Sequence, residues 1–141
     1  MASCGIDRAT GLPLYDLAHV EQSVGLIFTT RLGSIVMRRH FGSGLPELLG
    51  RRVVPQLLAA YRALLALSIN TWEPRLRVVR IDGAGNAPGA VRLGELSFRV
   101  LAYYRPRGHL GDPTIEGGVR AFTLRAQDNR LLFALEQQKA A

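Results

Sequence analysis

Paired carboxylates are the first chemistry to test in this sequence, because glycoside hydrolysis needs only two of them, held about 5 to 9 Å apart. The candidates are Glu21, Glu47, Glu73, Glu95 and Glu116. Their spacing places no two of them on one face of a helix or strand. Glu73 also lies two residues from Arg75, and a neighbouring cation favours the ionised carboxylate over a general acid. The sequence therefore predicts no catalytic residues.

Metal and cofactor chemistry is equally weakly supported. His19, His40 and His109 lie far apart, without a second ligand at metal-binding spacing. The segment Gly83–Gly85 resembles the start of a dinucleotide fingerprint, but it lies between two predicted strands rather than before a helix. We expect a turn there, and neither a metal nor a cofactor.

The segment Trp72-Glu73-Pro74-Arg75 combines a helix end with a rigid charged corner. Pro74 lacks an N–H and biases Glu73 away from helical geometry, so Glu73 is the predicted boundary residue. On local grounds, Glu73 and Arg75 are two solvated charges; the alternative is a docking element. If Arg75 docks a partner from the surface, Arg75→Ala should cost the complex roughly 2 to 5 kcal/mol and the monomer little.

A basic strand with aromatic residues offers another binding chemistry. Arg99, Tyr103, Tyr104 and Arg105 could neutralise and stack on single-stranded nucleic acid. The alternative, which we favour, is a half-buried strand whose second face meets protein or solvent. The runner-up function is thus a small basic nucleic-acid-binding domain.

Length and composition fit one domain, residues 1–141, with 48% hydrophobic residues and a formal net charge of +7. The single cysteine, Cys4, excludes an internal disulfide, and residues 1–5 lack the pattern of a signal peptide, so we expect a soluble protein made in the cytoplasm. Nearly all the basic residues are arginines spread along the chain, which favours folded interfaces over a disordered nucleic-acid arm.

The first half of the chain predicts helices. Residues 1–13 read as an extended or poorly ordered lead-in, and residues 14–73 as the helical part, with Asp16 as N-cap of a helix over 17–29. A longer helix should run from Pro55 to Trp72. The predicted inward residues are Leu17, Val20, Val24, Ile27 and Phe28 in the first helix, and Leu57, Leu58, Tyr61, Leu64, Leu65, Ile69 and Trp72 in the second.

The second half predicts a sheet over residues 75–126. Alternation is clear over 96–104, strands also start at Leu76 and span 120–125, and turn-rich residues 82–89 suit a hairpin. Residues 106–118 read as an exposed loop, and the tail, 127–141, could be helix, strand or a partner-ordered segment. Helices followed by strands indicate an α+β fold, with N-terminal helices packed on a small antiparallel or mixed β-sheet.

In order and spacing, several segments resemble the baseplate wedge family of contractile phage tails, which includes baseplate assembly protein W and a wedge subunit of the type VI secretion baseplate. These segments are Gly5-Ile6-Asp7-Arg8-Ala9-Thr10-Gly11, Thr29-Thr30-Arg31-Leu32-Gly33-Ser34, Met37-Arg38-Arg39-His40-Phe41-Gly42-Ser43 and Trp72-Glu73-Pro74-Arg75. The resemblance runs from Gly5 to about Arg105. The loop over 106–118 and the tail depart from the family pattern.

The resemblance implies a structural virion protein of the tail baseplate, without small-molecule substrate, cofactor or membrane association. Glu73, Pro74 and Arg75 would dock to wedge proteins, and the strands after Leu76 would initiate the tail sheath by strand pairing. Tube or hub proteins are further implied partners, and several copies would form a symmetric ring. Some family members were once labelled lysozymes, an activity that this sequence does not support.

Two structural expectations complete the analysis. The turn at 41–44 should need positive φ at a glycine, so Gly42→Val should cost about 1 to 3 kcal/mol, with Ser43 as its neighbour in the turn. The sheet should also expose an edge for a partner strand, blunted by arginines until that strand arrives. The expected arginines are Arg77, Arg80, Arg99 and Arg125.

Overall fold

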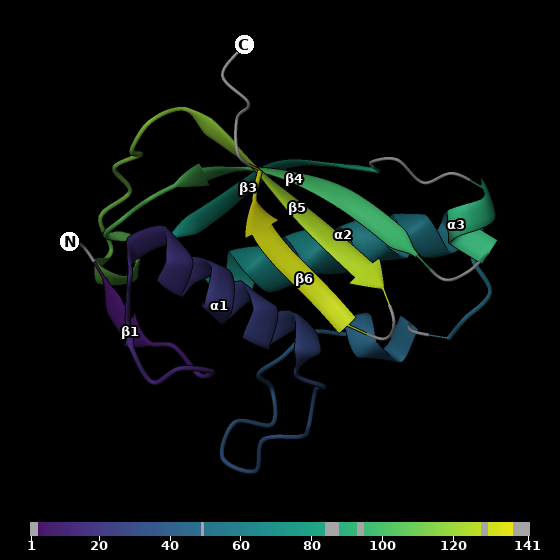
Figure 1. Cartoon of the computed structure of the whole chain (residues 1–141), viewed down its shortest axis with the longest axis horizontal. Helices are drawn as coiled ribbons and strands as arrows, with labels where there is room; N and C mark the ends of the chain where they lie inside the picture. Colours follow the sequence, from purple (N-terminus) through teal and green to yellow (C-terminus); the bar gives the residue numbers. More distant parts are fainter. Residues whose placement is uncertain (1–2, 49, 84–87, 93–94, 128–129, 137–141) are drawn as a thin grey trace.

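The computed structural model describes residues 3–48, 50–83, 88–92, 95–127 and 130–136. Its helices are α1 (Asp16–Thr29), α2 (Pro55–Trp72) and the short α3 (Pro88–Arg92), with 3₁₀ turns at Leu45–Leu48 and Gly108–Leu110. Its strands are β1 (Cys4–Ile6), β2 (Pro13–Tyr15), β3 (Leu76–Gly83), β4 (Leu96–Tyr104), β5 (Val119–Gln127) and β6 (Arg130–Leu135). Figure 1 shows these elements in sequence colours.

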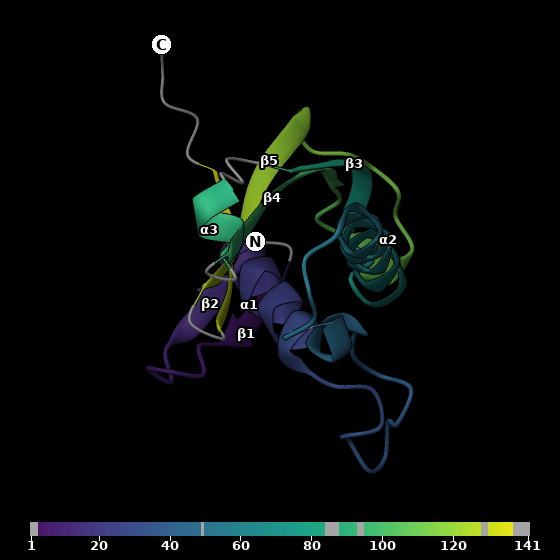
Figure 2. The same cartoon turned by 90° about the vertical axis from the view of Figure 1, so that its right-hand side faces the viewer.

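The four longer strands form one antiparallel sheet in the order β3-β4-β5-β6, which makes β3 and β6 its edges. β1 and β2 pair separately as a two-stranded antiparallel sheet. The larger sheet arches over the two long helices, with α2 packed against β3 and α1 against β6 (Figure 2). The predicted α+β fold is confirmed, and the sheet is antiparallel.

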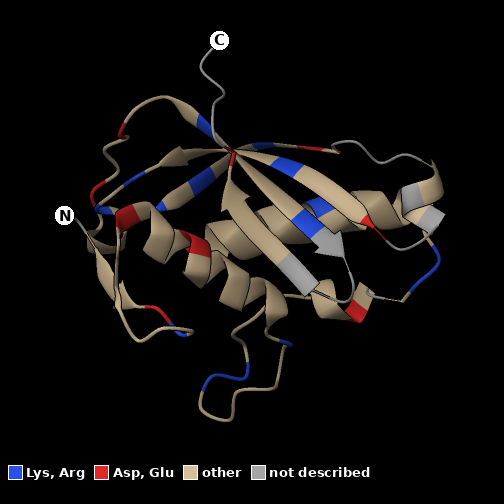
Figure 3. Cartoon of the chain, viewed as in Figure 1, with Lys and Arg blue, Asp and Glu red and all other residues tan. Residues whose placement is uncertain are grey.

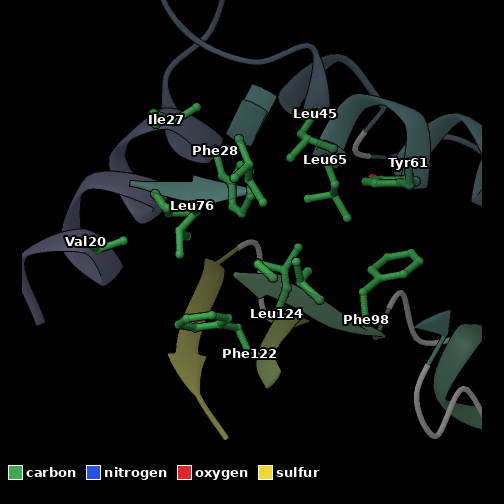
Figure 4. Close-up of a cluster of buried hydrophobic side chains, with 14 of the residues drawn as sticks. Val20, Ile27, Phe28, Leu45, Tyr61, Leu65, Leu76, Phe98, Phe122 and Leu124 are labelled. Carbon is green, nitrogen blue, oxygen red and sulfur yellow. The ribbon is translucent and has the colours of Figure 1, made fainter. Parts of the chain in front are cut away.

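The core lies between the arched sheet and the helices (Figure 4). The β4 side chains that face the helices alternate with partly or fully exposed neighbours, as the period of two requires. Burial of each large apolar side chain contributes about 1.5 to 3 kcal/mol. The buried residues of these elements are Val20, Val24, Ile27 and Phe28 on α1, Leu57, Tyr61, Leu65, Ser68 and Ile69 on α2, and Leu96, Phe98, Val100, Ala102 and Tyr104 on β4.

The start of α1 differs from the expectation. Asp16 is the first helical residue rather than the N-cap, and Tyr15 at the cap position makes no side-chain hydrogen bond to the helix. Asp16 has φ +48°, and its Oδ1 accepts a hydrogen bond from the Ser3 N–H at 3.3 Å. Its carboxylate therefore holds the N-terminal hairpin, a contact between residues 13 apart that local capping rules do not anticipate.

The N-terminal lead-in and the C-terminal part of the sheet are more regular than predicted. The described part of the predicted lead-in is extended, because β1 pairs with β2, and β2 continues to Tyr15, two residues into the predicted helical part. The third predicted strand is longer and pairs with β6, which carries the sheet past the expected end at residue 126 and leaves no helix over 130–135. The predicted turn at 82–89 includes residues 84–87, which lie outside the described part, and α3 begins at Pro88.

Candidate functional site

The corner at the end of α2 is built around a buried ion pair. Glu73 Oε1 accepts a hydrogen bond from Arg75 Nε at 2.6 Å, and Oε2 accepts one from Arg75 Nη2 at 2.8 Å. Glu73 is 1% exposed and Arg75 is 7% exposed, whereas Pro74 between them is exposed. This bidentate ion pair fixes both side chains in one geometry, and Pro74 restricts the backbone between them.

The remaining guanidinium donors of Arg75 reach two N-terminal elements. Arg75 Nη1 donates to Ser3 Oγ at 3.0 Å and lies 3.0 Å from His19 Nδ1 on α1. The interpretation of Glu73 and Arg75 as two solvated charges is therefore wrong, because both side chains are buried in the folded chain. The reason is tertiary, since the partners that cover this corner lie 72 and 56 residues earlier in the chain.

His19 is neutral in this arrangement, because its Nδ1 must accept the hydrogen bond from Arg75 Nη1. Burial lowers the pKa of His19 below its ordinary value, and the positive charge of Arg75 lowers it further. The negative charge of Glu73 acts in the opposite direction, and His109 adds to the lowering. The Arg75 guanidinium is thus the cation that pairs with the Glu73 carboxylate, and His19 is its neutral hydrogen-bond partner.

The loop after β4 closes over the same corner. The Arg105 N–H donates to the Arg75 carbonyl at 2.8 Å, and Gly108 lies so close to Pro74 that an added Cβ would stand 2.2 Å from the Pro74 carbonyl oxygen. Glycine is required there for the backbone to approach. A surface hollow beside the corner is lined by Pro74, Arg77, Arg105 and Asp112, among others.

The hollow is predominantly cationic at its rim. Arg77 is exposed, and Arg105 Nε is buried without an acceptor among the residues that the structure describes. A buried guanidinium donor without an acceptor is uncommon in a folded protein. The lining of the hollow thus carries two arginines, Arg77 and Arg105, and one carboxylate, that of Asp112.

The predicted turn before the first 3₁₀ segment has a special geometry at Gly42. This residue has φ +126°, and a Cβ added to it would stand 2.6 Å from the Thr30 carbonyl oxygen. The same Thr30 oxygen accepts from the Ser43 N–H at 3.1 Å, and the buried Ser43 Oγ donates to the Phe28 carbonyl at 3.2 Å. Gly42 and Ser43 thus fasten the chain to the last turn of α1.

The aromatic and basic residues of β4 do not form one nucleic-acid surface. Tyr104 is buried on the face toward the helices, and Tyr103 lies on the opposite face. Arg99 pairs with Glu136 at 2.5 Å. Single-stranded nucleic acid bound to one face of the sheet could therefore not stack its bases on both tyrosines.

The candidate glutamates lie in separate environments rather than facing one another across a site. Glu73 is buried with Arg75, whereas Glu47 pairs with Arg31 at 3.2 Å and Glu116 lies 3.7 Å from Arg120. Glu21 accepts a backbone hydrogen bond, and Glu95 directly precedes β4. Within the described ranges, no group of three or more His, Cys, Asp and Glu could hold a metal ion. No described helix is long and apolar enough to cross a membrane.

On each edge of the large sheet, a helix side chain caps a backbone amide. On β3, the Val78 N–H donates to Asn70 Oδ1 at 3.1 Å; on β6, the Leu135 N–H donates to Glu21 Oε1 at 2.6 Å. Two of the arginines expected to blunt an edge, Arg77 and Arg80, lie on β3. The other two, Arg99 and Arg125, lie on central strands and cannot do so. The sequence did not predict that Asn70 or Glu21 caps an edge strand. Their side chains reach the strand amides only because the helices pack against the sheet.

The chain is similar to known proteins of contractile tails. A family model described as baseplate wedge protein gp25 matches residues 15–106. Baseplate protein W of Escherichia phage P2 is 34% identical over 85 residues, which cover 60% of this chain and 74% of that protein. A chain of the pyocin R2 baseplate after contraction has a TM-score of 0.60 and 33% identity, and the match covers 73% of this chain and 99% of that one.

A crystal structure from Geobacter sulfurreducens, described as a tail-lysozyme candidate, is also similar. Its TM-score is 0.54 with 20% identity, over 77% of this chain and 93% of that chain. At this identity, the likeness shows a shared fold alone. The family match spans α1, α2, the charged corner, β3 and β4, and it ends before β5 and β6.

Proposed function

Because this chain belongs to the family of baseplate wedge protein gp25, we propose that it is a non-enzymatic structural subunit of a contractile-tail baseplate, carried in the virion or particle. The observation that supports this most is the family match over residues 15–106, which includes the buried Glu73–Arg75 corner. In this proposal the chain binds wedge proteins and the first ring of sheath, with tube or hub proteins as neighbours. It would be present in several copies around the tail axis.

The docking surface for wedge proteins is proposed at Glu73, Pro74 and Arg75 together with the adjacent hollow. The buried pair does not reach the surface, so its role is to hold the exposed Pro74 and the hollow in shape. Arg77 and Arg105 then present positive charge to the partner. A wedge segment that carries a carboxylate would complement this rim.

Arg77→Glu tests the docking surface. We expect incorporation of the chain into purified baseplates to fall about tenfold, since a like charge would face the partner carboxylate. Arg62→Glu is the matched control, because Arg62 is also exposed but lies on α2 and does not line the hollow. Quantitative mass spectrometry of gradient-purified particles gives the measurement. Equal incorporation of the two variants would contradict docking at the hollow.

Sheath initiation is proposed to use the edge of β3 rather than that of β6. β3 is eight residues long and β6 is six. The β3 amide is capped by the neutral, exposed Asn70, whereas the β6 amide is capped by the Glu21 carboxylate at 2.6 Å. A charge-assisted hydrogen bond is stronger than a neutral one. A partner strand would therefore displace the cap on β3 more easily, and main-chain pairing would then add a strand to the sheet.

Val78→Pro tests strand addition at this edge. Proline removes the outward N–H of Val78 while the ladder between β3 and β4 is kept, since proline is tolerated on the free side of an edge strand. We expect baseplates on tubes without sheath, seen by negative-stain electron microscopy. Asn70→Ala, which frees the same N–H, should leave sheathed tails. Sheath of normal length on Val78→Pro particles would contradict pairing at β3.

A further inference from the structure

The loop between α1 and the first 3₁₀ turn, residues 31–41, projects from the body of the molecule (Figure 1). It is ordered by its own backbone hydrogen bonds, including Gly33 N–H to the Arg39 carbonyl at 2.7 Å. The backbones of Arg31 and Ser43 form an isolated parallel β-bridge at the base of the loop. At its C-terminal end, Phe41 packs edge-to-face on Trp72, with ring centroids 5.0 Å apart. The loop thus projects from the body of the molecule, is held by its own hydrogen bonds and is anchored to α2 through Trp72.

The tip of this loop exposes apolar side chains. Met37 is 90% exposed and Val36 is 74% exposed, and both are next to the partly exposed Ile35. Leu32 is also mostly exposed on the other arm of the loop. Isolated surface hydrophobics are ordinary, but several within six residues on one projecting loop are typical of a contact surface.

The charge around the tip is of one sign. Residues 31–41 contain Arg31, Arg38 and Arg39 and no acidic residue, and Figure 3 shows blue and tan but no red on this loop. Arg31 pairs with Glu47, whereas Arg38 and Arg39 have no ion pair within the described part of the chain. An occupant of the tip would therefore need acidic groups around an apolar centre.

These features distinguish between classes of occupant. Nucleic acid would be expected to stack on aromatic rings, but the aromatic residues of the loop, His40 and Phe41, both pack on Trp72. A second copy of this chain carries a net charge of +7 and would bring more positive than negative charge to the contact. A protein with an apolar groove rimmed by carboxylates fits both the exposed aliphatic side chains and the arginines.

We propose that the loop over residues 31–41 is a second docking surface, which inserts Val36 and Met37 into an apolar groove of a partner protein whose rim carries Asp or Glu side chains that pair with Arg38 and Arg39. This surface is separate from the hollow beside Pro74. The inference rests on the proposed function only in expecting the partner among the tail proteins made in the same cell.

The test places a photoreactive benzophenone amino acid at position 37 and irradiates whole cells that produce all the tail proteins together with this chain. We expect a cross-link to one tail protein, at a peptide with apolar residues flanked by Asp or Glu. Cross-links only to nucleic acid, to lipid or to another copy of this chain would overturn the proposal, as would no cross-link. The same amino acid at Leu12, an exposed apolar position between β1 and β2 that does not line the hollow, is the site control and should not give that product.

Charge reversal tests the arginines separately. In the position-37 background, Arg38→Glu with Arg39→Glu should lower the yield of the cross-link about tenfold. Arg51→Glu with Arg52→Glu is the matched control, because it reverses another adjacent pair of exposed arginines outside the loop. Equal losses with both double variants would overturn the assignment of the rim.

The two proposals fail in different ways. Gradient fractionation of the same cells shows whether the chain is in baseplate particles, which tests the proposed function. The cross-link from position 37 shows whether the loop contacts an acidic groove, whether or not the chain enters those particles. A chain found in particles without a cross-link from position 37 would contradict the loop proposal alone.

Discussion

Arg75→Ala is expected to lower the free energy of unfolding of the isolated protein by about 3 to 5 kcal/mol, because it leaves the Glu73 carboxylate buried without its cation. Glu73 is 1% exposed, and both of its oxygens accept hydrogen bonds from the Arg75 guanidinium. The substitution also removes a donor to Ser3 and a hydrogen bond to His19. Urea unfolding, followed by circular dichroism and by fluorescence of the single tryptophan, Trp72, measures the change.

Arg80→Ala is a closely matched control for this substitution. The Arg80–Asp82 pair has the same two-residue separation and the same Nε to carboxylate distance of 2.6 Å, but the Arg80 side chain is 70% exposed. An exposed pair contributes at most about 1 kcal/mol. A similar loss for the two variants, or a loss under about 1 kcal/mol for Arg75→Ala, would show that burial does not decide the energy of the corner.

Removing both charges separates folding from docking at this corner. Glu73→Leu with Arg75→Leu is expected to destabilise less than Arg75→Ala, because it leaves no orphaned buried carboxylate. If the double variant folds but does not enter baseplates, the ion pair is needed for the shape of the docking surface. An assembly defect of Arg75→Ala alone would not distinguish docking from unfolding.

Local patterns were enough to predict the elements that build the core. The Pro55–Trp72 helix has the predicted bounds, because Pro55 suits a first helical turn and Pro74 excludes continuation past Glu73. The alternating segment Leu96–Tyr104 is likewise the strand β4. In both elements, the spacing of apolar residues along a short stretch of sequence is enough to predict the secondary structure and its buried face.

Features that depend on distant residues could not be read in the same way. The burial of Arg75 depends on its contacts with Ser3 and His19, and the sequence around position 75 does not predict these contacts. The sequence does not decide the structure of residues 130–135, because the short apolar run Leu131-Leu132-Phe133 suits a helix or a strand. Pairing with β5 makes it the strand β6. The capping of the sheet edges by Glu21 and Asn70 is invisible for the same reason.

Gly42→Val is expected to destabilise the protein by about 3 kcal/mol, the upper end of the range for a strained backbone position. Two costs act together. A residue with a Cβ disfavours φ +126°, and the Cβ itself would stand 2.6 Å from the Thr30 carbonyl oxygen, which is backbone and cannot rotate away. Moving Thr30 would lengthen its hydrogen bond from the Ser43 N–H. Thermal unfolding followed by circular dichroism gives the measurement.

Gly33→Val separates the two costs, because Gly33 lies in the same loop with φ +83° but has no atom within 4 Å of an added Cβ. It should cost only about 1 kcal/mol, from backbone strain alone. Equal losses at Gly33 and Gly42 would mean that the close approach to Thr30 relaxes without cost. A larger loss at Gly42 would show that the close approach to the Thr30 carbonyl oxygen, which joins the end of the loop over residues 31–41 to the end of α1, adds a cost that Gly33 does not have.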